Sequence, residues 1–370
     1  MSLHARFVSD VPEETQRVAR ATFRQGNQVL QMRDELGTIF TDEHFVDLFP
    51  NVGRPAEAPW RLALVTVLQF CENLTDRQSA DAVRGRIDWK YALSLDLTDD
   101  GFDFSILSEF RSRLVTNGAD ARLFQIMLTQ FEDQGLLKSR GKQRTDSTHI
   151  LAAVHRLNQL ELVHETLRHT LNELALQAAA WLKHRVTADW FERYSHRTSN
   201  YLIPKKDSER QAWAEQVARD GLWLLEQLYH GGQYPELVNI PAVNILRCVW
   251  LQNVSQIEGQ VYLREPKDQP PSAQRITSPY DLDARYSTKR DLSWTGCKVH
   301  LTETCDEDLP HLIINVETRS STEPDHVVTA MVHDHLAQAG YLPDQHFVDQ
   351  GYMSVEQLVK LHNSRRIEMT

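Results

Sequence analysis

Residues 137–150, which read LKSRGKQRTDSTHI, decide the fold of the larger part of the chain. The end of this stretch is a short run of small and β-branched residues around one acid, Asp146, and it predicts a β-strand. The start places cations at alternate positions, which share one face if the segment is extended. Those cations are Lys138, Arg140, Lys142 and Arg144.

The cationic row has two interpretations. In the first, it contacts the phosphates of a nucleic acid. In the second, it belongs to a solvated edge strand or linker, where lysine and arginine oppose aggregation. Lys298, in a later predicted strand, has similar alternatives: it contacts phosphate, or it is an ordinary solvated strand lysine.

A second acid ends another predicted strand. Residues 346–352, HFVDQGY, indicate a buried strand that ends at Asp349 and a glycine turn. Strands are also predicted at 294–303 and 311–318, followed by a helix at 325–339. We expect the first three strands to form an antiparallel meander and the fourth to join beside the first after a helical crossover. This order brings Asp146 and Asp349 to one position of the sheet.

Two converging carboxylates predict a reaction type. Carboxylate oxygens suit magnesium ions that also hold phosphate oxygens. Two such ions, about 3.5–4 Å apart, activate an attacking oxygen and stabilise the leaving one. Asp146 and Asp349 therefore predict in-line phosphoryl transfer on a nucleic-acid backbone. The alternative for each acid is an ordinary cap or turn residue.

Residues 12–140 have the pattern of a helical region. A helix is predicted over Pro59–Glu72, and Asn73-Leu74 ends it. Thr75 and Gln78 form a capping-box pattern that begins a second helix, which runs to about Gly85. Further helices are expected at residues 105–115 and 119–134.

This helix–turn–helix pattern also has two interpretations. As a DNA-binding element, it would direct Arg77, Arg84 and Arg86 at phosphates. As an all-helical interaction module, it would carry no information about nucleic acid, because short helix pairs are common.

The fold class that follows is α+β with a high helical content. We expect a helical N-terminal domain over residues 1–136 and an α/β core over residues 137–370, with a helical insertion at about 151–265. Leucines at three- and four-residue steps after Leu157 mark the first helix of that insertion.

Composition narrows the protein class. The 370 residues are 41% hydrophobic and 25% charged, which excludes a disordered or fibrous chain. The net charge of −11 argues against a protein that binds nucleic acid over its whole surface by general electrostatic attraction, although residues 141–300 are slightly basic. No apolar run is long enough to span a bilayer, and no apolar signal core begins the chain. Four cysteines without a CxxC pair predict a reducing cytoplasm, without a disulfide framework or a zinc ribbon.

These motifs, in this order, resemble the bacterial insertion-sequence transposases of the DDE class with an InsH-type helical N-terminal region. The resemblance covers about residues 15–360. It is carried by Val52-Gly53-Arg54-Pro55, Asn73-Leu74-Thr75-Asp76-Arg77-Gln78, Phe104-Ser105 to Arg113, Thr145-Asp146-Ser147-Thr148-His149, Asp281-Leu282-Asp283-Ala284-Arg285-Tyr286, Trp294 to Thr304, and Val348-Asp349-Gln350-Gly351-Tyr352.

The resemblance implies a ribonuclease-H-like core in which Asp146 is the first catalytic acid and Asp349 the second, both binding metal. It implies two Mg²⁺ or Mn²⁺ ions, cleavage of DNA strands at transposon ends and transfer of the freed 3′-hydroxyl to target DNA. The implied partners are double-stranded DNA and further copies of the chain in a transposition complex. The N-terminal helices are expected to recognise element ends or to assemble that complex.

Two positions depart from the family pattern. Cys297 stands where the family has an aromatic residue before Lys298, and a small apolar side chain keeps the strand intact. The third acid, a glutamate on a helix after a further strand, has no counterpart, because Glu356 and Glu368 follow Asp349 too closely. We therefore expect a core that is incomplete at its C-terminus and a truncated transposase. The alternatives are a non-catalytic DNA-binding, assembly or regulatory fragment of a transposase, and a helical scaffold unrelated to DNA.

Overall fold

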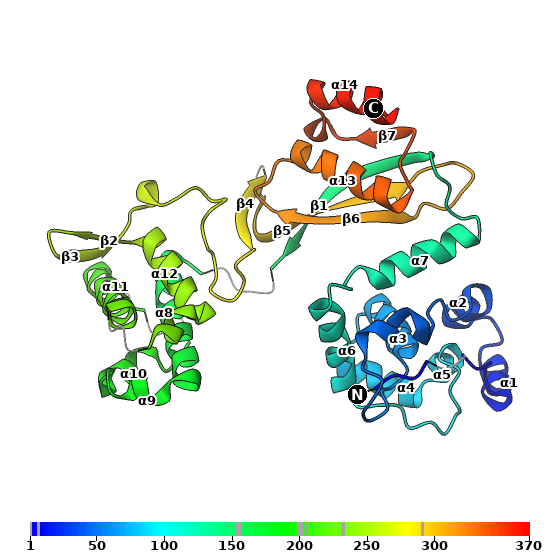
Figure 1. The fold of residues 1–370 in the computed structure, drawn as a ribbon, viewed down its shortest axis with the longest axis horizontal. Helices are drawn as coiled ribbons and strands as arrows, with labels where there is room; N and C mark the ends of the chain where they lie inside the picture. The colour runs from blue at the N-terminus through cyan, green and yellow to red at the C-terminus, as the bar shows by residue number, and fades with distance from the viewer. Residues whose placement is uncertain are drawn as a thin grey trace. The chain divides into compact units, whose positions relative to one another are not determined.

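The computed structural model describes residues 2–5, 8–152, 157–197, 203–204, 206–230, 234–289 and 292–370. The chain divides into two units, Met1–Lys138 and Ser139–Thr370 (Figure 1). The mixture of helices and one mixed sheet confirms the α+β class. Among the described helices, none has the length and apolarity needed to cross a bilayer.

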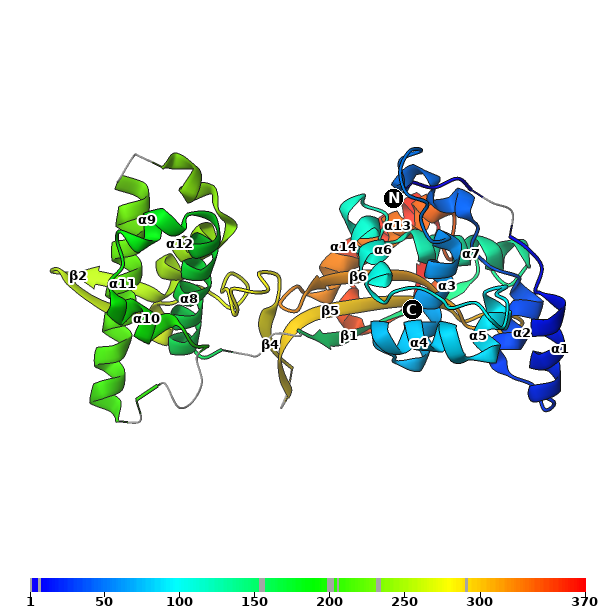
Figure 2. The same ribbon diagram turned by 90° about the horizontal axis from the view of Figure 1, so that it is seen from below.

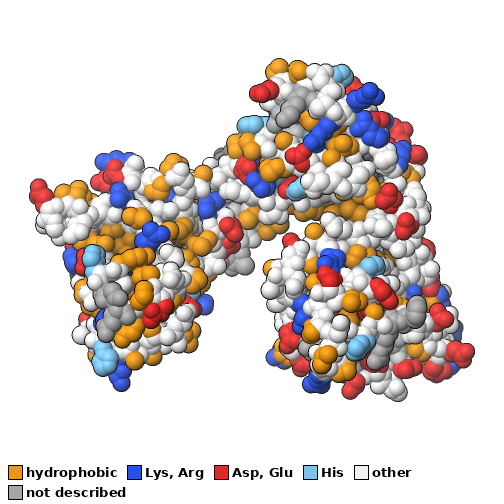
Figure 3. Space-filling model, viewed as in Figure 1, with side chains coloured by type: hydrophobic (Ala, Val, Ile, Leu, Met, Phe, Trp, Pro, Cys, Tyr) orange, Lys and Arg blue, Asp and Glu red, His pale blue; other side chains and the backbone are white. Residues whose placement is uncertain are grey.

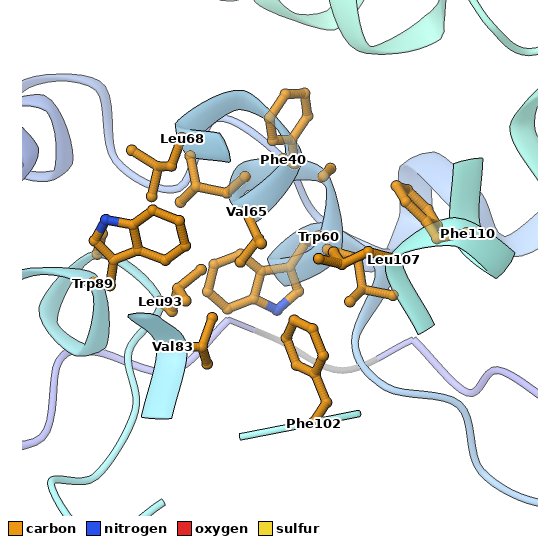
Figure 4. Packing of buried hydrophobic residues seen from close by; sticks show 14 of the residues in the cluster. Phe40, Trp60, Val65, Leu68, Val83, Trp89, Leu93, Phe102, Leu107 and Phe110 are labelled. Atoms are coloured by element: carbon orange, nitrogen blue, oxygen red, sulfur yellow. The ribbon is translucent and has the colours of Figure 1, made fainter. Parts of the chain in front are cut away.

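The first unit is helical. Its elements are α1 Glu13–Thr22, α2 Gln28–Leu36, the 3₁₀ helix η1 Asp42–Leu48, α3 Pro59–Glu72, α4 Asp76–Gly85, α5 Ile87–Ala92, α6 Ser105–Thr116 and α7 Arg122–Asp133. They enclose an apolar core in which Trp60, Trp89, Phe102 and Phe110 surround the aliphatic side chains of α3 (Figure 4).

The predicted pair α3–turn–α4 is confirmed residue by residue. Pro59 begins α3, and Asn73 ends it in the left-handed conformation, with φ of 54°. The Thr75 hydroxyl accepts a hydrogen bond from the Gln78 backbone N–H, while the Gln78 side chain accepts one from the Thr75 backbone N–H. These local signals fix both helix ends without help from distant residues.

The second unit contains the sheet. Its strands are β1 Lys142–Leu151, β4 Arg285–Lys289, β5 Leu292–Thr304, β6 Ile313–Ser320, β7 Gln345–Val348 and β8 Glu368–Met369. β5 pairs antiparallel with β1 on one side and with β4 and then β6 on the other (Figure 2). β7 pairs parallel with β1, which confirms the predicted meander and crossover. β4 and β8 were not predicted.

Helices complete this unit. α13 Asp325–Ala339 makes the crossover and packs on one face of the sheet (Figure 1). The 3₁₀ helix η4 Gln350–Tyr352 and α14 Val355–Arg365 follow β7. Gly296 is required where β5 meets β1, because a Cβ there would lie 2.0 Å from the Ile150 carbonyl oxygen. The adjacent Cys297 lies within β5, so the strand forms with cysteine at this position.

The predicted insertion is mostly helical. It contains α8 Gln159–Gln177, α9 Ala179–Lys183, α10 Ala188–Tyr194, α11 Asp207–His230, η2 Pro235–Asn239, α12 Pro241–Asn253 and η3 Pro266–Asp268. The prediction is wrong at its end, where β2 Val254–Ile257 and β3 Gln260–Leu263 form a hairpin. The cause is a two-residue turn, Glu258-Gly259, in which both residues have positive φ.

Candidate active site

The two predicted acids lie on neighbouring strands. β1 and β7 run parallel, and their last paired residues are Thr145 and Val348. Asp146 and Asp349 follow these residues directly, and both side chains are exposed to solvent. The sheet therefore brings two carboxylates from distant parts of the sequence to equivalent positions. The prediction that their strands are neighbours is confirmed, and their catalytic role stays a prediction.

The two acids differ in how their carboxylates contact the neighbouring backbone. One Asp146 carboxylate oxygen accepts a hydrogen bond from the Ser147 backbone N–H at 2.7 Å. Asp349 stands at the start of η4, where its carbonyl accepts the Tyr352 N–H at 2.9 Å, and its side chain does not cap that turn. The Asp349 carboxylate is thus not used to begin the helix.

A buried tyrosine lies close to both acids. The Tyr352 hydroxyl is 2.7 Å from His300 Nδ1, and the two rings meet edge to face. Burial raises the pKa of Tyr352 well above its usual value, and the negative charges of Asp146 and Asp349 act in the same direction. The hydroxyl therefore stays protonated at neutral pH and is available as a hydrogen-bond donor.

A chain of buried polar side chains lies on the opposite face of β1 from Asp146. Thr145 Oγ1 is 2.7 Å from both Thr302 Oγ1 and His346 Nε2, and His346 Nδ1 is 2.8 Å from His333 Nε2. Burial lowers the pKa of His333 to about 4 and that of His346 to about 3, so both rings are neutral at pH 7. These hydrogen bonds tie β1, β5, β7 and α13 together directly behind the acids.

The expected row of four cations does not form one extended face. β1 begins only at Lys142, and Arg140 has φ of 61°, which turns the chain. Lys138 is exposed and belongs to the first unit. Arg140 pairs with Asp344 at 2.7 Å and also donates to two backbone carbonyls near the C-terminal end of α14.

The two cations that do lie in β1 face acids. Lys142 Nζ is 3.9 Å from a Glu307 oxygen, and Arg144 Nε donates to Glu303 at 3.0 Å. Cationic and anionic side chains are interspersed on the face of the molecule that Figure 3 shows. Contact between this segment and DNA stays a prediction, and it would require DNA to compete with these acids.

Lys298 lies beside the site, but its ammonium group is engaged in contacts within the protein. Its ammonium group is 2.9 Å from an Asp325 oxygen and 3.0 Å from the Glu323 carbonyl, and its side chain is only 17% exposed. The lysine thereby fixes the start of α13 on the sheet. A phosphate contact by Lys298 would require this ion pair to open.

Sequence reasoning missed Tyr352, His300 and Asp325 as neighbours of the acids. Tyr352 was visible only as the end of the motif that contains Asp349. His300 and Asp325 carried no usable signal, because their contacts depend on the pairing of β1 with β5 and on the packing of α13.

The chemistry of the two acids fits a magnesium ion. Mg²⁺ is commonly held by one or two carboxylates together with waters and substrate phosphates. Asp146 and Asp349 supply such oxygen atoms at an exposed position. Within the described ranges, no group of three or more histidine, cysteine, aspartate and glutamate side chains is arranged to hold a metal.

Comparison with known proteins gives one match. Residues 18–113 match the family described as Transposase domain (DUF772), from within α1 to within α6. This match supports a transposase-like protein. The matched residues all lie in the first unit, whereas the two acids lie in the second. Comparisons with curated proteins and with solved structures gave no match.

Proposed function

We propose that this chain is a DDE-class transposase that cleaves DNA strands and transfers the 3′-hydroxyl end by in-line phosphoryl transfer. One observation carries the proposal: Asp146 and Asp349 stand at equivalent positions on neighbouring strands of a chain whose first unit matches a transposase domain. In this proposal, the exposed acids face the DNA backbone.

The order of the elements supports a ribonuclease-H-like core. Three strands in antiparallel succession, β1, β5 and β6, are followed by a crossover helix and a strand parallel to the first. Such a crossover puts the C-terminal end of β7 beside the middle of β1. Both acids stand at that place, where a sheet can present ligands to a substrate.

The residues have separate roles in the proposed mechanism. Asp146 and Asp349 would hold divalent metal, which activates the attacking oxygen and stabilises the leaving one when it is bound. The Tyr352 hydroxyl stays protonated, so in this proposal it acts as a hydrogen-bond donor near both acids and not as a base. Glu368 is not assigned as a third acid, because its partner in β7 is Gln345, four residues before Asp349.

In the first unit we propose that α3 and α4 contact the element ends. α4 exposes Arg77, Gln78 and Arg84 along one side, and its other side is buried in the core. The acidic side chain of Asp81 pairs with Arg84, and Arg77 stacks on the Phe104 ring. The surface is therefore polar and of mixed charge, which suits a groove contact more than general attraction to phosphate.

Manganese binding to the full chain tests the proposal. We expect Mn²⁺ titration followed by electron paramagnetic resonance to show binding that Asp146→Asn and Asp349→Asn each weaken at least about tenfold. Asp268→Asn, an exposed acid of the same unit, is the matched control and should bind like wild type. Double-stranded DNA should tighten the binding, because phosphate oxygens complete the coordination. Wild-type affinity in both site variants would overturn the proposal.

A further inference from the structure

The hydrogen-bond ladder does not reach Asp349. The β1–β7 pairing ends at Thr145 and Val348, and on its other side Val348 N–H donates to the Thr370 carbonyl. Asp349 comes one residue later, at the beginning of a 3₁₀ turn. The position of its carboxylate relative to Asp146 therefore depends on what holds that turn.

Tyr352 is the buried residue of the turn. Asp349, Gln350 and Gly351 are exposed, whereas Tyr352 is 1% exposed and lies among the largest buried side chains. Its hydroxyl meets His300 Nδ1 of β5, and His300 is the register partner of Ser147 in β1. Ser147 directly follows Asp146 in β1.

The backbone of Tyr352 is held as firmly as its side chain. The Thr329 hydroxyl, from α13, donates to the Tyr352 carbonyl at 2.8 Å, and the Tyr352 N–H closes the turn on the Asp349 carbonyl. Thr329 is buried, so this bond is shielded from water. A single residue thus connects the segment after Asp349 to β5 and to α13.

The geometry points to Tyr352 as a positioning residue that sets the distance between the Asp349 and Asp146 carboxylates, through its hydroxyl on β5 and its carbonyl on α13. The inference rests on the proposed function, because that distance matters only if both acids bind one metal centre. Groups that orient metal ligands typically change metal affinity 10- to 100-fold when they are removed.

If Tyr352 only stabilised the fold, a different result would be expected. Tyr194 is a second buried tyrosine of the same unit, and its hydroxyl donates to Asp220 at 2.7 Å, in the helical insertion. Tyr194→Phe therefore removes a comparable buried hydrogen bond, but from a place unrelated to the acids. It separates general loosening of the unit from a change at the acid pair.

The test measures Mn²⁺ affinity of the full chain at a temperature well below its melting point. Tyr352→Phe and Thr329→Val should each raise the Mn²⁺ dissociation constant about tenfold, with circular dichroism like wild type. Tyr194→Phe should leave the dissociation constant unchanged. If Tyr352→Phe does not fold, Thr329→Val decides by the same criteria.

Three results would overturn the inference. Wild-type affinity in Tyr352→Phe and Thr329→Val, with weakened binding in Asp349→Asn, removes the positioning role and leaves the proposed function standing. Equal weakening in Tyr194→Phe shows general loosening and also removes that role. Wild-type affinity in both Asp146→Asn and Asp349→Asn overturns the proposed function, and the inference with it.

Discussion

The helical core around α3 in the first unit and the sheet around the two acids in the second unit bury different kinds of side chain. In the first unit, the interior around α3 is apolar, with Trp60 and Trp89 almost fully buried. In the sheet of the second unit, β1 and its neighbours β5 and β7 bury Thr145, His300 and His346. An apolar core stabilises through area removed from water, whereas a buried polar network loses stability wherever a member lacks a partner.

The polar network is in fact only partly satisfied. His300 Nε2 and His333 Nδ1 are buried and have no hydrogen-bond partner among the described residues. Such groups cost free energy, but the bonds that do form specify one register of β1 against β5 and β7. The sheet is therefore less stable than an apolar interior would be, at the place where it positions the two acids.

The largest expected effect is the loss of folding stability when the apolar core of the first unit is disrupted. Trp89→Ala should lower the free energy of unfolding by about 3–5 kcal/mol, because it leaves a cavity in a closely packed core. Urea unfolding followed by circular dichroism measures the loss. Mn²⁺ binding should not change, since the acids belong to the other unit. A loss below about 1 kcal/mol would show that this core is loosely packed.

The next effect concerns pH. The pKa values of His333 and His346 are lowered by burial to about 4 and about 3, against about 6.5 in an unfolded chain. As pH falls below about 6.5, the unfolded state binds protons that the folded state excludes, so stability falls. We expect a loss of about 1–2 kcal/mol for each histidine between pH 7 and pH 5.

Urea midpoints at the two pH values measure this effect. His333→Gln should reduce the difference between them, because it removes one of the two groups. Equal reduction by His184→Gln, an exposed histidine of the insertion, would contradict the assignment to the buried pair.

A smaller effect distinguishes substitutions on the two faces of β1. Thr145→Val removes the hydroxyl that contacts both Thr302 and His346, and it should cost about 1–3 kcal/mol by leaving buried groups without partners. Thr148→Val, on an exposed position of the same strand, should change stability by less than about 0.5 kcal/mol. Similar losses in both variants would mean that the buried network does not specify the strand.

Local signals in the sequence predicted the local structure well. The capping box of Thr75 and Gln78 and the left-handed Asn73 act within one turn, so the ends of α3 and α4 followed directly from the sequence. The meander and crossover followed from the order of strongly β-forming segments. β4 was missed because Arg285–Lys289 is polar and becomes a strand only through pairing with β5.

The candidate site was predictable only in part. Asp146 and Asp349 stood out because each acid belongs to a strand-like segment, and strand order then placed them together. The cations were misplaced because the residue with positive φ is Arg140 itself and not the adjacent Gly141, where a turn would be expected. Tyr352 and His300 contact each other across distant segments, and no local pattern encodes such a contact.

The most direct test of the central claim, that Asp146 and Asp349 form one metal site, is iron-mediated cleavage of the protein backbone. Fe²⁺ bound at the site, with ascorbate and peroxide, generates radicals that cut the nearby chain. Mass spectrometry should find cuts close to residues 146 and 349 in the same sample, and Asp146→Asn should abolish both. Cuts at one position alone, or at both positions in Asp146→Asn, would contradict a shared site.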